Sequence, residues 1–276
     1  MIAQLDRRAV LRYPSGTLAA GVIAVLLLLA VLAPVIVRGS ADRISENILI
    51  PPFQGFGLGT DELGRNVALE LLYGLRISLL VGLLAAASAT LLGAAVGAIA
   101  GFFGGVVDGL VMRISESFQV LPTFILAALI VALLGAGLTR VIAVIALLAW
   151  PQTARLMRAQ VLRIKQLEFV DAARCLGIRE GSIMLREVIP NAFAPVLATA
   201  TLTIGDAILI EAGLSFLGLS DPSLVTWGRM LNSGQRFLFE AWWLSVFPGL
   251  GIFITVLVFN VAGDTLAKLL NPRGPK

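Results

Sequence analysis

The chain has 276 residues, of which 58% are hydrophobic and 14% are charged; because a soluble globular domain carries about 25% charged residues, this composition excludes that class and predicts an integral membrane protein. It contains no histidine and one cysteine, which excludes an internal disulfide and argues against a Cys/His zinc site or a histidine-based catalytic triad. The formal net charge of +4 does not indicate a nucleic-acid partner, since the basic residues of a membrane protein mainly report its orientation.

Six segments are apolar for long enough to cross a bilayer, whose hydrocarbon core of about 30 Å takes about 20 helical residues. The first is longer than the apolar run of a signal peptide, so we expect a retained anchor. The sequence predicts an all-α integral membrane protein with six transmembrane helices, at 17–37, 77–101, 112–136, 139–160, 192–217 and 242–268. The expected parts are a cytoplasmic N-terminal segment (1–16), the first helix (17–37), an outer loop (38–76), a five-helix core (77–268) with an inner loop (161–190), and a cytoplasmic tail (269–276).

The distribution of positive charge predicts the orientation. Two thirds of the 21 Lys and Arg residues lie in the segments that face inward if the N-terminus is cytoplasmic, and seven of them fall between Arg155 and Arg186. Cytoplasmic loops of membrane proteins carry an excess of Lys and Arg. We therefore expect both termini and the inner loop to be cytoplasmic.

Small and aromatic residues of the spans indicate how they are placed. Gly93, Gly97 and Gly101 recur at every fourth position of the second span, and such a face allows two helices to approach closely. We expect it to pack within the subunit rather than against a partner. Three tryptophans near the outer boundary are expected to anchor the membrane interface: Trp227, Trp242 and Trp243.

The inner loop has the pattern of two short helices. Phe169, Ala173 and Leu176 recur at helical spacing, and Gly177 stands where a helix would end in a left-handed residue. A second short helix is expected to carry Ile183, Met184 and Val188, and Pro190 to introduce the fifth span. On these grounds alone the loop could lie on lipid headgroups as an amphipathic segment or present a compact surface to another protein.

The same loop resembles the EAA signature of the permeases of ATP-binding cassette (ABC) importers. The matching residues are Asp171-Ala172-Ala173, then Gly177, and later Ile189-Pro190; Asp stands for the usual Glu, and Glu187 occupies an apolar position. In that family the loop is a coupling helix that docks on a cytoplasmic ATPase. The resemblance implies that coupling here rests on Glu168, Asp171, Ala172, Ala173, Leu176, Gly177, Ile183 and Pro190.

Further motifs resemble the C-type permeases of the dipeptide, oligopeptide and nickel importers. They are "LGTDELGRN" at 58–66, "EAGLSFLGLSDP" at 211–222, "TWGRML" at 226–231 and "FNVAGDTLAKLLNPR" at 259–273. The resemblance implies a type I ABC importer fold in a bacterial inner membrane. It also implies three kinds of partner: a B-type permease, two ABC ATPases that hold ATP and magnesium, and an extracytoplasmic solute-binding protein. No cofactor is expected in this chain, which has no P-loop. Cargo is expected to be a di- or oligopeptide, with glutathione, opines and nickel chelates open. Asn66 replaces the usual Asp and puts an ion pair there in doubt.

Two carboxylates lie within the fifth span. Asp206 and Glu211 are five residues apart, about 140° around a helix, so we expect them to serve different surfaces. An ionisable group inside a membrane is costly and usually faces a cavity or a partner. They are candidates for the transport pathway, with a structural role as the competing interpretation. As a proton relay they would instead make the chain a proton-coupled secondary carrier.

Overall fold

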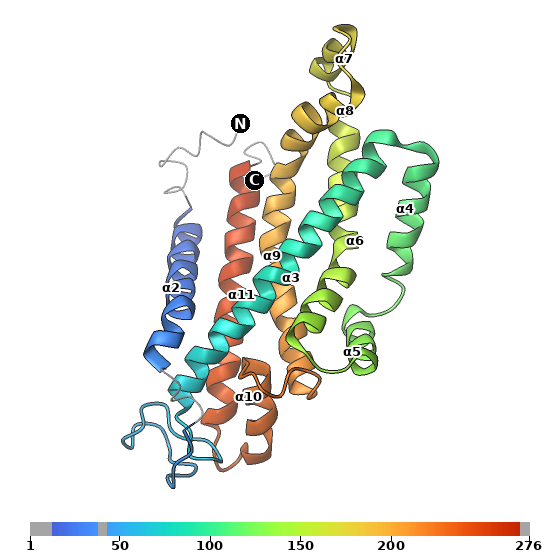
Figure 1. Ribbon diagram of the computed structural model, residues 1–276. Helices are drawn as coiled ribbons and strands as arrows, with labels where there is room; N and C mark the ends of the chain where they lie inside the picture. Colours follow the sequence, from blue (N-terminus) through green and yellow to red (C-terminus); the bar gives the residue numbers. More distant parts are fainter. Residues whose placement is uncertain (1–12, 38–42, 271–276) are drawn as a thin grey trace.

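The computed structural model describes residues 13–37 and 43–270, and all regular secondary structure in these ranges is helical (Figure 1). The N-terminal segment up to residue 12, the tail beyond residue 270 and the start of the outer loop lie outside the described residues. The elements are α2 (Pro14–Val37), α3 (Val67–Phe103), α4 (Gly105–Ser117), α5 (Thr123–Leu134), α6 (Leu138–Ile164), α7 (Glu168–Cys175), α8 (Glu180–Ile183), the π-helical turn η2 (Met184–Val188), α9 (Ile189–Phe216), α10 (Trp227–Gly234), the 3-10 turn η3 (Gln235–Phe237) and α11 (Trp243–Leu270).

Five helices of the described chain are long and apolar enough to cross a membrane, one fewer than expected. The prediction of a single third span at 112–136 is wrong, because α4 ends at Ser117 and α5 begins only at Thr123. Pro122 precedes α5 and, lacking an N–H, cannot continue a helix. In Figure 1 α4 begins beside one end of α3 and α5 lies toward the opposite end of the bundle. The segment that crosses between these ends is thus a broken helix.

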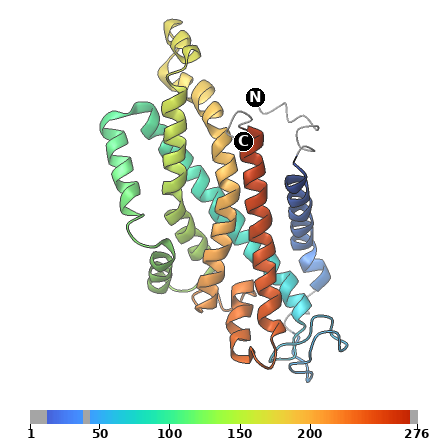
Figure 2. The same ribbon diagram turned by 180° about the vertical axis from the view of Figure 1, so that it is seen from behind.

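The two ends of the bundle are distinct. The start of α2, the end of α11 and the projecting helix α7 lie at one end, which we call the α7 end, whereas α10 and the loop 43–66 lie at the other, the α10 end (Figures 1 and 2). The described ends of the chain are therefore on the same side as the inner loop, as the charge distribution predicts.

Helix α3 crosses the bundle diagonally and packs on α6 and α9 (Figure 1). Its glycine face lies against α6: a Cβ on Gly93 would come within 2.6 Å of the Trp150 carbonyl oxygen, and one on Gly101 within 2.9 Å of the Arg158 carbonyl oxygen. The expected close packing within the subunit is confirmed. The helix also begins ten residues before the expected start of the second span, with Asn66 as its N-cap: the Asn66 Oδ1 accepts the Ala68 N–H at 2.9 Å.

Helix α2 covers one side of the bundle, on α3 and α11. The buried residues of α2 are mostly small, with Ala33 fully buried, while Leu18 and Val31 are about 70% exposed. Such an apolar surface suits lipid tails, so α2 is positioned as the expected membrane anchor.

Candidate functional site

The inner loop forms an exposed tip at the α7 end (Figure 1). In α7, Val170 and Ala173 are buried and pack with Ile183, which is also fully buried. Phe169 and Leu176 are instead 41% and 80% exposed. The helix predicted from the spacing of Phe169, Ala173 and Leu176 is confirmed, but Ala173 points inward while the other two are exposed.

Backbone geometry fixes the end of α7. Gly177 has φ +77°, in the left-handed region, as the sequence predicts. The Gly177 N–H donates to the Arg174 carbonyl at 2.9 Å, and the Ile178 N–H donates to the Ala173 carbonyl at 3.2 Å. This pair of bonds is a Schellman motif, which satisfies carbonyls that the helix end leaves free. It turns the chain sharply at the tip.

Ion pairs brace the tip further. The Arg174 guanidinium contacts Asp171 Oδ1 and Glu180 Oε1, each at 2.9 Å. The hydrogen bond to Glu180 raises the pKa of Arg174, burial opposes this rise, and the hydrogen bond to Asp171 adds to it. Arg174 thus connects α7 to the start of α8, although pairs this exposed contribute little stability.

The chain beyond the tip is one long helix. The prediction of a separate second helix before Pro190 is wrong, because α8, η2 and α9 run together from Glu180 to Phe216. The Ile189 N–H bonds to the Met184 carbonyl, five residues back, and this widened turn accommodates Pro190, which has no N–H to give. The sequence marks Pro190 as a break, whereas the π-helical turn carries the helix across it.

The structure thus separates the predicted coupling residues into two groups. Ala173 and Ile183 are buried and hold the tip to the bundle, while the others are exposed. The exposed group consists of Glu168, Asp171, Ala172, Leu176, Gly177 and Pro190.

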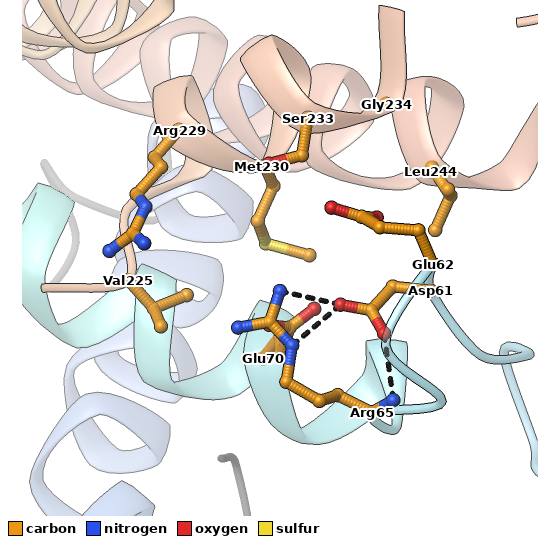
Figure 3. A pocket seen from close by; sticks show the side chains of 10 residues that line it. All are labelled: Asp61, Glu62, Arg65, Glu70, Val225, Arg229, Met230, Ser233, Gly234 and Leu244. Atoms are coloured by element: carbon orange, nitrogen blue, oxygen red, sulfur yellow. Dashed lines mark hydrogen bonds and ion pairs between the residues drawn. The ribbon is translucent and has the colours of Figure 1, made fainter. Parts of the chain in front are cut away.

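A network of charged groups lies at the α10 end (Figure 3). The Arg65 guanidinium bonds to Asp61 Oδ2 (2.5 Å from Nη2, 2.6 Å from Nε) and lies 3.1 Å from Glu70 Oε1. Burial lowers the pKa of Arg65, but the carboxylates of Glu70 and Asp61 outweigh this effect and leave it above its usual value. Arg229 of α10 lines the same space and donates to the Leu224 carbonyl at 3.0 Å.

The cavity inside this network is too small for a substrate. Its volume is about 20 Å³, roughly the space of one water molecule. Asp61 also accepts the backbone N–H groups of Leu63 and Arg65 at 2.9 and 2.7 Å. The motif at 58–66 therefore folds the outer loop onto the starts of α3 and α10. Sequence reasoning missed Glu70 because it lies just outside that motif, and Arg229 because only the fold brings it beside Arg65 and Glu70.

Two tryptophans belong to this internal framework rather than to the membrane interface. Trp227 and Trp243 are 2% and 3% exposed, and their indole N–H groups donate to the carbonyls of Leu71 (3.0 Å) and Thr60 (3.1 Å). Only Trp242 of the three predicted anchors is exposed. A buried indole with a satisfied N–H rigidifies the packing around it.

Glu211 lies inside the subunit. It is 1% exposed and accepts hydrogen bonds from the hydroxyls of Ser215 at 2.6 Å and Ser78 at 3.2 Å. The backbone N–H of Trp227 in turn donates to the Ser78 hydroxyl, with 3.4 Å between the nitrogen and the oxygen. In the described part of the chain, no Lys or Arg forms an ion pair with Glu211. The residue thus joins α9 to α3 and α10, which favours its structural role.

Asp206 lies on a different face of α9, as the helical spacing predicts. It is exposed, and no described residue forms a hydrogen bond with its carboxylate. The same face carries Asn191 and Thr199 at helical spacing toward the α7 end. Figure 2 shows this part of α9 between α6 and α11, with α3 behind. A polar row of this kind on a membrane-spanning helix belongs to water or to protein rather than to lipid.

Comparisons with known proteins agree on one family. Residues 93–274 match the family model described as binding-protein-dependent transport system inner membrane component. The dipeptide transport system permease protein DppC of Alkalihalophilus pseudofirmus is 37% identical over 90% of this chain and 82% of the relative. The oligopeptide transport system permease protein OppC of Bacillus subtilis is 36% identical over 98% and 90%. The glutathione transport system permease protein GsiD of Shigella flexneri is 40% identical over 83% and 76%.

A solved structure shows the same fold. One chain of the MetNI methionine ABC transporter, in an inward-facing conformation, superimposes with a TM-score of 0.59 at 20% identity. The match covers 73% of this chain and 96% of that one.

Proposed function

This chain belongs to the family of binding-protein-dependent transport system inner membrane components, and on that premise we propose that it carries short peptides through the membrane as the permease of an ABC importer. The observation that carries the proposal is the similarity to dipeptide and oligopeptide permeases over 90% and 98% of the chain. The chain is a non-catalytic transport subunit, and the family assignment disfavours a proton-coupled secondary carrier using Asp206 and Glu211.

The transporter that we propose has the subunits of an ABC importer. A B-type permease pairs with this chain, two ABC ATPases bind ATP and magnesium on the cytoplasmic side, and a solute-binding protein delivers cargo from outside. The α7 end is cytoplasmic and the α10 end extracytoplasmic. The proposed division of the chain is an anchor helix (17–37), an outer loop, a core of the remaining helices, and the inner loop that couples it to the ATPases.

Coupling rests on the shape of the tip. Phe169, Ala172 and Leu176 form an exposed apolar face on α7, surrounded by charged residues, which suits a cleft on a soluble protein better than water. Behind it, the helix from Glu180 to Phe216 spans about 55 Å. Closure of the ATPases on ATP would move α7, and this rigid helix would carry the movement to the α10 end.

Asp206 is proposed to face the transport pathway. The support is its exposed position in the polar row of α9 and the cost of leaving a carboxylate in hydrocarbon. Glu211, by contrast, is proposed to hold α3, α9 and α10 together at the outer end.

Reconstitution tests the proposed function. The permease, co-purified with its partner permease and ATPases, is placed in proteoliposomes together with the binding protein. Uptake of labelled dialanine should require ATP on the ATPase side and the binding protein on the other. Uptake driven by a proton gradient without ATP would refute it.

A further inference from the structure

A cavity of about 330 Å³ opens between α6, α9 and α11 in the half of the bundle nearest α7. Pockets for small molecules have volumes of roughly 300–1,000 Å³. Two other cavities of similar volume, at α2 and α3, are lined mainly by leucine and other apolar side chains and suit lipid tails. This one differs because it combines apolar walls with polar side chains from all three helices: Gln160, Arg163, Asn191, Thr199 and Asp264.

Its two charged side chains are exposed and have no partner among the residues that the structure describes. Arg163 comes from α6 and Asp264 from α11, and within residues 13–37 and 43–270 neither side chain forms a hydrogen bond or an ion pair. The Gln160 Oε1 is buried and accepts no hydrogen bond there. Two neighbouring cations are paired: Arg158 of α6 binds Asp108, and Lys165, just beyond α6, donates to the Gly101 carbonyl at 2.9 Å. A buried acceptor without a donor, in a cavity that two charged side chains also line, indicates a site that a ligand completes.

We propose that this cavity binds a small zwitterion, an amino acid or short peptide with free ends. Arg163 binds the carboxylate, which a guanidinium can hold through two parallel hydrogen bonds. Asp264 accepts the ammonium group, and the Gln160 oxygen accepts a further N–H of the ligand. The proposal rests on the proposed function and extends it, because a site in the cytoplasmic half would hold cargo before its release.

Protection from labelling tests the site. In the complete transporter, Cys175→Ala removes the only cysteine and Thr199→Cys places a maleimide-reactive group in the cavity. The complex is held in nanodiscs of phosphatidylcholine, and the probes are dialanine, N-acetyl-dialanine, which lacks the ammonium, and dialanine amide, which lacks the carboxylate. Dialanine should slow labelling at a concentration about tenfold lower than either blocked peptide, since a hydrogen-bonded charge has this effect on affinity.

Substitutions test which side chain binds each end of the peptide. With Arg163→Gln, dialanine and its amide should protect equally; with Asp264→Asn, dialanine and its N-acetyl form should do so. Arg155→Gln, on an exposed part of α6 that does not line the cavity, is the matched control and should keep the full selectivity.

Equal protection by all three peptides, or by none, would overturn the proposal. Protection of the cysteine that appears only when phosphatidylethanolamine is added would also overturn the proposal, because the bound zwitterion would then be the lipid headgroup. Dialanine uptake by the same complex in proteoliposomes separates the two claims. Uptake without protection overturns the inner site alone, and absence of ATP-dependent uptake overturns the proposed function.

Discussion

Replacing Gly177 by valine should uncouple the permease without removing it from the membrane. A Cβ at this position meets nothing within 4 Å, so the effect comes from the backbone alone. At φ +77° the left-handed backbone conformation costs an L-residue about 1–2 kcal/mol of conformational energy. A β-branched residue such as valine rarely adopts it. The two hydrogen bonds of the Schellman motif are weakened at the same time.

The size of the effect follows from how little else holds α7. Eight residues are too few for a helix that is stable alone, so α7 depends on its C-terminal turn and on the packing of Val170 and Ala173. A loss of 1–2 kcal/mol lowers the ratio of ordered to disordered α7 by roughly 5- to 30-fold. The bundle itself does not depend on this turn and should remain folded.

The assay compares Gly177→Val with Gly177→Asn in the assembled transporter. Asparagine tolerates the left-handed region, so this variant should retain ATPase recruitment and dipeptide uptake, whereas the valine variant should lose most of both at normal membrane levels. Normal uptake by Gly177→Val, or equal loss in both variants, would refute the backbone argument.

Three further predictions concern the carboxylates and the topology. Glu211→Leu should destabilise the purified complex by roughly 1–3 kcal/mol because it leaves buried hydroxyls unpaired. Glu211→Gln still accepts hydrogen bonds and should lose less stability. Equal thermal unfolding of the two variants would contradict the role of Glu211 in joining the helices. Asp206→Asn should assemble normally but change uptake rate or cargo preference, and an unchanged profile would remove it from the pathway. In a Cys175→Ala background, Ser182→Cys should react only with membrane-permeant reagents and Ser223→Cys from outside, whereas the reverse accessibility would invert the orientation.

The sequence was sufficient for features that depend on local pattern. Apolar length predicted three of the five long helices closely. It placed the starts of α3 and of the helix from Glu180 to Phe216 too late, because both helices begin within charged segments. Gly177 was predicted at a left-handed helix end because its position after an amphipathic run has a local cause. The glycines of α3 were predicted to pack within the subunit, and their contacts with α6 confirm it.

Other features depend on residues far apart in the chain. Pro122 interrupts a segment that hydropathy alone predicts as one continuous helix. Pro190 does not interrupt its helix, because a π-helical turn forms just before it. The tryptophans were read as interface anchors because their partners, the Leu71 and Thr60 carbonyls, are more than 150 residues away. Ion pairs between distant residues, such as Arg158 with Asp108, likewise cannot be predicted from the spacing of residues along the chain.

The central claim is that α7 docks on an ATPase, and a photo-crosslinking amino acid at Leu176 tests it most directly. Leu176 is 80% exposed at the tip, and Leu217, 54% exposed toward the α10 end, is the matched control. On illumination of the assembled transporter in membranes, position 176 should crosslink to the ATPase subunit and position 217 should not. Failure of position 176 to capture the ATPase in a complex that transports dialanine, or its capture from position 217, would contradict the account.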